Sequence, residues 1–326
     1  MVSIVATHLH WTLFIPPSRT DAFGVVNFIT LSKETNDPSY LTRATRLADT
    51  VHDVLGRTRD GKARLPGASD ANPLGGGLRI GKEDEGGSDG DGQYHHYLTL
   101  WMFALNRLSK ATHNSKFNDE AIALAKAVHP NFFIDRRTDH PRMVWKIAMD
   151  MSRPLVYSQG NLDPIDGLMV FRKLQAESSI ATILQEEIND YQKVIQLKGK
   201  HFVSSDTLDL GMTLWTSHWL AGKEEYFTDL QRQAERQVIS LLKGGYLDRS
   251  TSRRLAFREY GTCLGIGCLR GPEDELSSFR ARLIDTWERH LSSTLGDLRA
   301  ISEVMRAAAL IPGAFRSGYL GEERSV

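Results

Sequence analysis

Carboxylate side chains recur in the turns that lead into predicted helices. Asp91 lies just before an apolar stretch that starts at Gln93, and Asp163 and Asp166 flank a proline. Two carboxylates facing one cavity suit hydrolysis of a glycosidic bond, because one acid protonates the leaving oxygen while the other activates water or stabilises the charged sugar ring. We therefore take Asp91, Asp163 and Asp166 as the candidate catalytic acids.

Helix capping gives the same aspartates a second explanation. A carboxylate at a helix N-terminus accepts hydrogen bonds from free backbone N–H groups and interacts favourably with the helix dipole. Asp89 and Asp91 differ from a simple cap, since they alternate with glycines that let the backbone approach a ligand closely. Capping alone accounts for Asp91, Asp163, Asp166, Asp206 and Asp209, so both explanations stay open.

Aromatic and polar side chains accompany the acids. The stretch from Gln93 to Leu108 is apolar nearly all round, which indicates a helix surrounded by other helices, with polar groups only in its first turn. Tryptophan and tyrosine rings at such a place offer faces on which sugars stack. The candidate substrate-binding residues are Asp89, Gln93, Tyr94, His95, Trp101, Trp145, Asp209, Trp215, Arg258 and Glu259.

Several of these side chains also fit a purely structural role. Tryptophans at helical spacing are usually core residues, and a buried histidine is as often a hydrogen-bonded core group as a proton carrier. Arg258 and Glu259 stand on an otherwise apolar helix, where charge must be paired or functional. A structural ion pair of Glu259 with Arg79, Lys82 or Arg254 is the alternative.

Helical periodicity and start signals continue along the whole chain, which predicts an all-α fold. Strand signals are confined to Arg64–Leu65 and Leu78–Ile80, in a long loop where we expect a small β-hairpin. Asp37, Asp163 and Asp206 are the expected caps. The predicted helices are Ser3–Phe14, Asp21–Lys33, Pro38–Leu55, Gln93–Ser109, Asn118–Val128, Pro141–Met151, Pro164–Gln175, Ile180–Leu197, Thr207–Leu220, Lys223–Leu242, Ser250–Cys268, Glu273–His290 and Leu298–Leu310.

Helices without a polar face alternate with amphipathic ones. The stretches that begin at Gln93, Pro141, Thr207, Ser250 and Leu298 look buried all round, and the helices around Gln185 and Gln231 carry one polar face. Such alternation is typical of repeated helical hairpins. Which helix faces inward between residues 141 and 197 stays open.

This pattern, with the segment from Asp91 to Trp101, resembles the six-hairpin glycosidase superfamily, which includes epimerase and lyase relatives. The resemblance implies one (α/α)6 toroid over residues 1–326, with a pocket at one end of the barrel. Fold alone does not define the chemistry. The loops expected to line the pocket are Gly86–Gly92, Asp135–His140, Gln159–Asp166, Ser204–Asp209, Leu247–Arg253 and Ser292–Asp297.

Composition narrows the class of protein. The 40 basic residues balance the 40 acidic ones without a basic patch, which argues against nucleic-acid binding. No apolar run reaches the length of about 18 residues that a membrane span needs, and the N-terminus lacks a signal-peptide pattern. With two cysteines, Cys263 and Cys268, outside any disulfide pattern, we expect a cytoplasmic protein.

Metal and cofactor signatures are weak. The Asp89–Gly92 segment lacks the first and last oxygen ligands of a calcium loop, and adjacent histidines such as His95 and His96 diverge on a helix. We expect no metal and no cofactor. The leading hypothesis is acid/base hydrolysis of a carbohydrate substrate. The alternatives are a sugar epimerase, a small-molecule cyclase or lyase of secondary metabolism, and a non-catalytic helical scaffold; the oligomeric state stays open.

Overall fold

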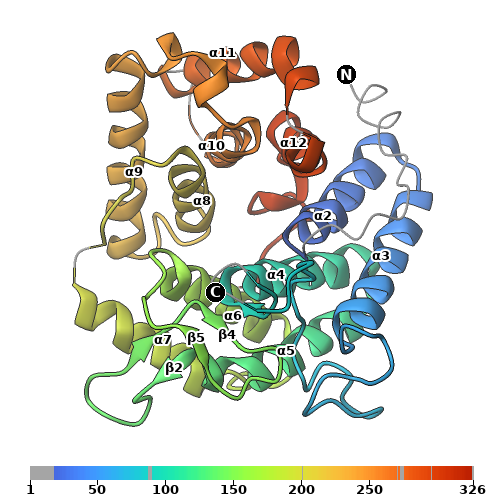
Figure 1. Ribbon diagram of the computed structural model, residues 1–326. Helices are drawn as coiled ribbons and strands as arrows, with labels where there is room; N and C mark the ends of the chain where they lie inside the picture. Colours follow the sequence, from blue (N-terminus) through green and yellow to red (C-terminus); the bar gives the residue numbers. More distant parts are fainter. Residues whose placement is uncertain are drawn as a thin grey trace. The chain divides into compact units, whose positions relative to one another are not determined.

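A computed structural model describes residues 18–86, 90–199, 201–269, 271, 275–294 and 296–324. Within these ranges the protein is mostly helical, which confirms the predicted class (Figure 1). The chain divides into two compact units, one comprising Met1–Lys200 with Arg324–Val326 and the other His201–Glu323. The expected helix Ser3–Phe14 and Asp89 lie outside the described residues.

Unit 1 consists of inner and outer helices in alternation. The central helix α4 (His95–Thr112) packs against both α2 (Ser18–Thr35) and α6 (Asp163–Glu177). These three are buried on nearly every side, because apolar residues surround their axes. The inward helix between residues 141 and 197 is therefore α6. The outer helices are α3 (Ser39–Leu55), α5 (Lys116–Val128) and α7 (Gln185–Lys198).

Unit 2 repeats the same alternation. Its central helix, α10 (Ala256–Cys268), packs between α8 (Thr207–Ser217) and α12 (Gly296–Leu310), and the outer helices are α9 (Glu225–Lys243) and α11 (Glu275–His290). Asp206 caps α8 as predicted, accepting hydrogen bonds from the backbone N–H groups of Leu208 and Asp209. Short 3₁₀ helices in the two units span His129–Phe132, Tyr246–Asp248, Thr251–Arg253, Leu291–Ser293 and Gly313–Phe315.

Short strands occur where the sequence predicts a helix. The expected helix Pro141–Met151 is wrong, because its backbone is extended and pairs with neighbouring segments. A three-stranded sheet has the order β1–β4–β5, with Gln93 opposite Ile147 and Tyr94 opposite Lys146. The strands are β1 (Gln93–Tyr94), β2 (Phe133–Ile134), β3 (Arg142–Met143), β4 (Lys146–Ile147) and β5 (Pro154–Val156).

Other predicted element boundaries also differ from those in the structure. The helix predicted from Gln93 begins at His95, since Gln93 and Tyr94 belong to the sheet. In the long loop, the described residues form one isolated bridge between Arg57 and Arg64 in place of a hairpin. Asp163 is the first residue of α6, and Leu162 occupies the cap position.

Neither cysteine is in a disulfide, and both thiols are buried in α10. Burial raises the pKa of each thiol well above its usual value. Across the described ranges, no helix combines the length and the hydrophobicity needed to cross a membrane.

Candidate functional site

The first turns of α4 and α6 meet through a carboxylate and two imidazoles. Nδ1 of His95 lies 3.4 Å from Oδ1 of Asp163, and Nδ1 of His96 lies 3.9 Å from the same oxygen. Asp163 and His95 are buried, whereas the side chain of His96 is 33% exposed. A buried carboxylate thus lies within 4 Å of a partly exposed imidazole.

Tyr191 of α7 lies behind His95. Its hydroxyl is 2.7 Å from Nε2 of His95, and burial, together with nearby carboxylates, raises the pKa of Tyr191 well above its usual value. The phenol therefore keeps its proton. When it donates that proton to Nε2, the neutral imidazole carries its own proton on Nδ1, which lies 3.4 Å from both Asp163 Oδ1 and the hydroxyl of Thr99.

Tyr94, His96, Tyr97 and Trp145 form what we term the aromatic group. The Tyr94 ring stacks on Tyr97 and meets Trp145 edge-on, with centroid distances of 5.2 Å in both pairs. Trp145 donates a hydrogen bond to Ser158 at 2.9 Å. Tyr97 and Trp145 are half-buried, so part of this aromatic surface reaches solvent close to Asp163.

Lys146 connects this region to a neighbouring pocket. Its buried ammonium group donates to the carbonyl of Gly90 at 2.7 Å and lies 5.0 Å from the centroid of the Tyr94 ring. Trp145 precedes Lys146 in the aromatic group, and Ala148 and Met149 follow it in the pocket wall. Sequence reasoning missed Lys146 because it placed the whole segment in a helix.

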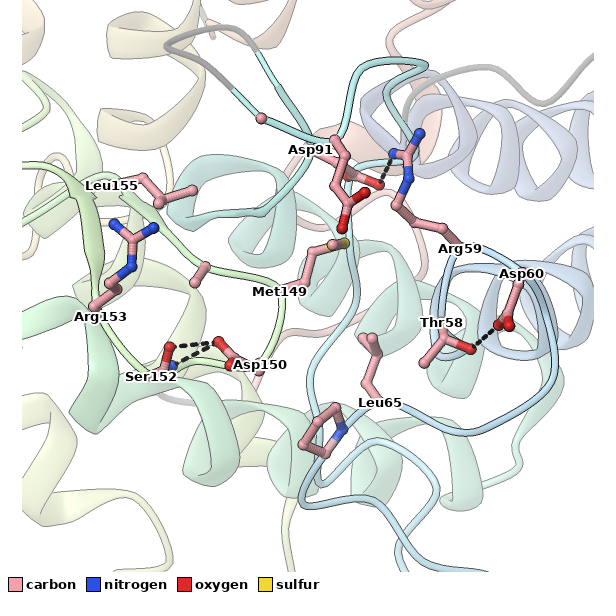
Figure 2. Close-up of a pocket in the computed structure, with 14 residues that line it drawn as sticks. Thr58, Arg59, Asp60, Leu65, Asp91, Met149, Asp150, Ser152, Arg153 and Leu155 are labelled. Carbon is pink, nitrogen blue, oxygen red and sulfur yellow. Dashed lines mark hydrogen bonds and ion pairs between the residues drawn. The ribbon is translucent and has the colours of Figure 1, made fainter.

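The pocket has a volume of about 800 Å³. Figure 2 shows the side chains of Asp150, Ser152 and Arg153 on one side and those of Thr58, Arg59 and Asp60 on the other. Leu65, Met149 and Leu155 contribute apolar surface. The pocket lining therefore combines positively and negatively charged side chains with apolar ones.

Asp91 lines this pocket, but its carboxylate is fully engaged. Oδ2 accepts hydrogen bonds from Arg59 at 2.9 Å and Arg79 at 3.2 Å, and Oδ1 accepts from the N–H groups of Gly81 at 3.0 Å and Gly92 at 2.9 Å. Its side chain has no exposed surface. These contacts favour a structural role, in which Asp91 holds the long loop against the start of α4.

Gln93 has a comparable position. Its side-chain amide donates to the carbonyls of Gly76 and Met149 at 2.8 Å and accepts from the N–H of Leu78 at 3.1 Å. A Cβ at Gly77, where φ is 73°, would overlap this amide. Gln93 therefore fixes the loop to the β4–β5 turn.

Two of the candidate tryptophans belong to the core. Trp101 donates to Nε2 of His52 at 3.1 Å, and Trp215 donates to the carbonyl of Phe315 at 3.2 Å. Each side chain is 1% exposed. Trp145 is the candidate tryptophan that offers partly exposed surface.

The remaining candidates lie in the two units separately. In unit 1, Asp166 is buried in the first turn of α6, three residues after Asp163. In unit 2, Asp209 is half-buried in the first turn of α8, and Arg258 pairs with Asp206. Asp135–His140 connects β2 to β3 and does not lead into an inner helix.

Glu259 occupies a buried ion pair of unit 2. Its two oxygens accept from Arg254 at 2.7 and 2.5 Å, and Tyr246 and Trp287 donate to them at 2.9 and 2.8 Å. The side chains of Glu259 and Arg254 are 0% and 2% exposed. This is the structural alternative that the sequence left open.

Comparisons with known proteins do not identify a family. No family model, no curated protein and no solved structure matches the chain. In the part of the chain that the structure describes, no three His, Cys, Asp or Glu side chains are grouped so as to hold a metal ion. The function is therefore inferred from the geometry of the site.

Proposed function

We propose that the protein is a carbohydrate-active enzyme that hydrolyses a glycosidic bond at the first turns of α4 and α6. The observation that carries this proposal is Asp163, held by His95 and His96 beside a half-exposed aromatic group. The alternation of inner and outer helices within each unit supports a six-hairpin (α/α)6 arrangement.

Asp163 and Asp166 are the acid/base pair in this proposal. Residues three apart on a helix lie on the same side, with Cβ atoms about 5–6 Å apart, a spacing that lets two carboxyl groups reach the separations of about 5–10 Å used in glycoside hydrolysis. His96 exchanges the proton of Asp163 with solvent, and Trp145 and Tyr97 stack on the sugar ring. The neighbouring pocket, whose lining combines carboxylates and two guanidinium groups with apolar side chains, suits the hydroxyls of an adjoining sugar unit.

The test is hydrolysis of a panel of nitrophenyl glycosides and neutral oligosaccharides by the full chain. Asp163→Asn is expected to lower kcat at least about 100-fold, the contribution typical of general acid/base catalysis. The matched control is Asp119→Asn, which changes an exposed aspartate in the first turn of α5. Full activity of a folded Asp163→Asn variant would remove Asp163 from the mechanism.

A second candidate function is sugar epimerisation, which the Tyr191–His95–Asp163 contacts favour. A histidine whose proton position is set from both sides is suited to moving a proton next to a sugar carbonyl. The distinguishing experiment is proton NMR of N-acetylmannosamine in D₂O. Deuterium exchange at C2 that His95→Asn abolishes would favour the epimerase, and its absence together with hydrolysis of the panel would favour the glycosidase.

A further inference from the structure

A smaller cavity of about 350 Å³ lies in unit 2, where α10 and α12 begin. Its apolar lining includes Ala256, Phe257 and Leu298, with Trp287 contributed by α11. Leu255 also lines the cavity and is 39% exposed, so apolar surface continues from the interior to solvent. The cavity volume lies near the lower end of the range for ligand pockets, so the cavity can hold a molecule no larger than a single six-membered ring with a small substituent.

The cavity favours an uncharged occupant. Arg254 is the one charged side chain among the described lining residues, and Glu259 balances it through two hydrogen bonds of 2.7 and 2.5 Å. The indole N–H of Trp287 is also bonded to Glu259, at 2.8 Å. A charged ligand would lose its hydration in this cavity and would find no unpaired charge of opposite sign to interact with, because Glu259 already neutralises Arg254.

One buried hydroxyl in the described lining lacks a hydrogen-bond partner. Oγ1 of Thr294 is buried and makes no hydrogen bond within the described ranges. By contrast, the hydroxyl of Ser302 donates to the carbonyl of Leu298 at 2.7 Å, and that of Ser252 bonds Ser250 at 2.8 Å. A buried hydroxyl without a partner costs free energy, which a ligand hydroxyl or a bound water would recover.

We propose that this cavity binds a small neutral molecule with an apolar ring and a single hydroxyl group, its hydroxyl bonded to Thr294 and its ring against Trp287 and Leu298. The residues that line this cavity belong to unit 2, whereas Asp163 belongs to unit 1. The proposal therefore does not depend on the carbohydrate activity, and either can fail alone.

Isothermal titration of the full chain with phenol, benzoate and glucose tests the proposal. Phenol is expected to bind, benzoate to be excluded by its charge, and glucose by its additional hydroxyls. Absence of phenol binding, or benzoate binding of equal affinity, would overturn the proposal and indicate that only water fills the cavity.

Two variants locate the bound phenol. Thr294→Val removes the hydroxyl at nearly constant volume and is expected to weaken binding about 3- to 10-fold, the value of one hydrogen bond. Leu298→Trp should fill the cavity and abolish binding. The control is Thr286→Val, which changes a half-buried threonine of α11 outside the cavity lining. Unchanged affinity in folded Thr294→Val, with melting temperature checked, would place phenol elsewhere.

Discussion

The hydrogen-bond partners of each buried carboxylate distinguish the acids with a structural role from the candidate catalytic acid. Glu259 and Asp91 are each bonded to arginine and to further N–H or O–H donors, so their lone pairs are occupied. Asp163 instead faces two imidazoles, which can give or take a proton. Sequence could place Asp91 and Asp163 at helix starts, but it could not identify their partners, because several of these come from distant segments.

Glu259→Gln tests the buried ion pair. The change keeps the shape of the side chain but leaves the charge of Arg254 buried without a counter-ion, and we expect a loss of about 3 to 5 kcal/mol in the free energy of unfolding. Denaturant unfolding measures it. Glu275→Gln, at an exposed glutamate of α11, is the control and should change stability by less than about 0.5 kcal/mol. A loss below about 1 kcal/mol in Glu259→Gln would contradict the assigned role.

His52 makes stability depend on pH. Burial, with the charge of Lys116 adding to it, lowers the pKa of His52 from 6.5 to about 4, and the neutral ring accepts a hydrogen bond from Trp101. Because the unfolded chain binds the proton more strongly, this contribution is fully present above pH 6.5 and is lost as pH falls towards 4. Between pH 7 and pH 5 this effect lowers the free energy of unfolding by about 2 kcal/mol.

The measurement is urea unfolding at both pH values. His52→Gln should lose less stability than the wild type over this interval, while His140→Gln, at an exposed histidine, should follow the wild type. An identical pH dependence in wild type and His52→Gln would refute the assignment.

At the scale of elements, glycines determine how closely α8 and α10 pack. A Cβ added at Gly211 would overlap the carbonyl of Gly261, and one added at Gly265 would overlap that of Gly211. The two helix backbones therefore approach each other directly. Larger residues at these positions would separate two inner helices of unit 2.

Gly211→Ala is therefore expected to destabilise the protein, although alanine favours a helix by about 1 kcal/mol over glycine. We expect a net loss of about 2 kcal/mol or more, because overpacking must shift backbone. The control is Gly296→Ala, at the start of α12, where a Cβ meets no atom within 4 Å. A rise in melting temperature for Gly211→Ala would disprove close packing at this crossing.

The periodicity of apolar residues in the sequence was sufficient to predict most helices but not to predict the strands. Helices such as α9 carry a long apolar stripe that a sequence displays directly. Strands of two or three residues have too few positions to show alternation, so β4 and β3 were mistaken for a buried helix. Met143, Val144 and Ile147 are buried as strand residues, and a buried helix would bury them too, which is why their apolar character did not decide between the two interpretations.

On the scale of the molecule, each unit brings the starts of two of its inner helices together. In unit 1 His95 meets Asp163, and in unit 2 Arg258 meets Asp206. Each pair joins one acid to one basic side chain, so the expected gathering of acidic turns around a single pocket stays a prediction. Tyr191 could not have been found from sequence, since it stands on an outer helix, and only the fold brings it to His95.

The most direct measurement is a crystal structure of the Asp163→Asn variant with a saccharide that the wild type cleaves. We expect a sugar ring against Trp145 and Tyr97, with the glycosidic oxygen within about 3 Å of the side chain at position 163. A saccharide bound out of reach of the first turns of α4 and α6 would contradict the proposed site.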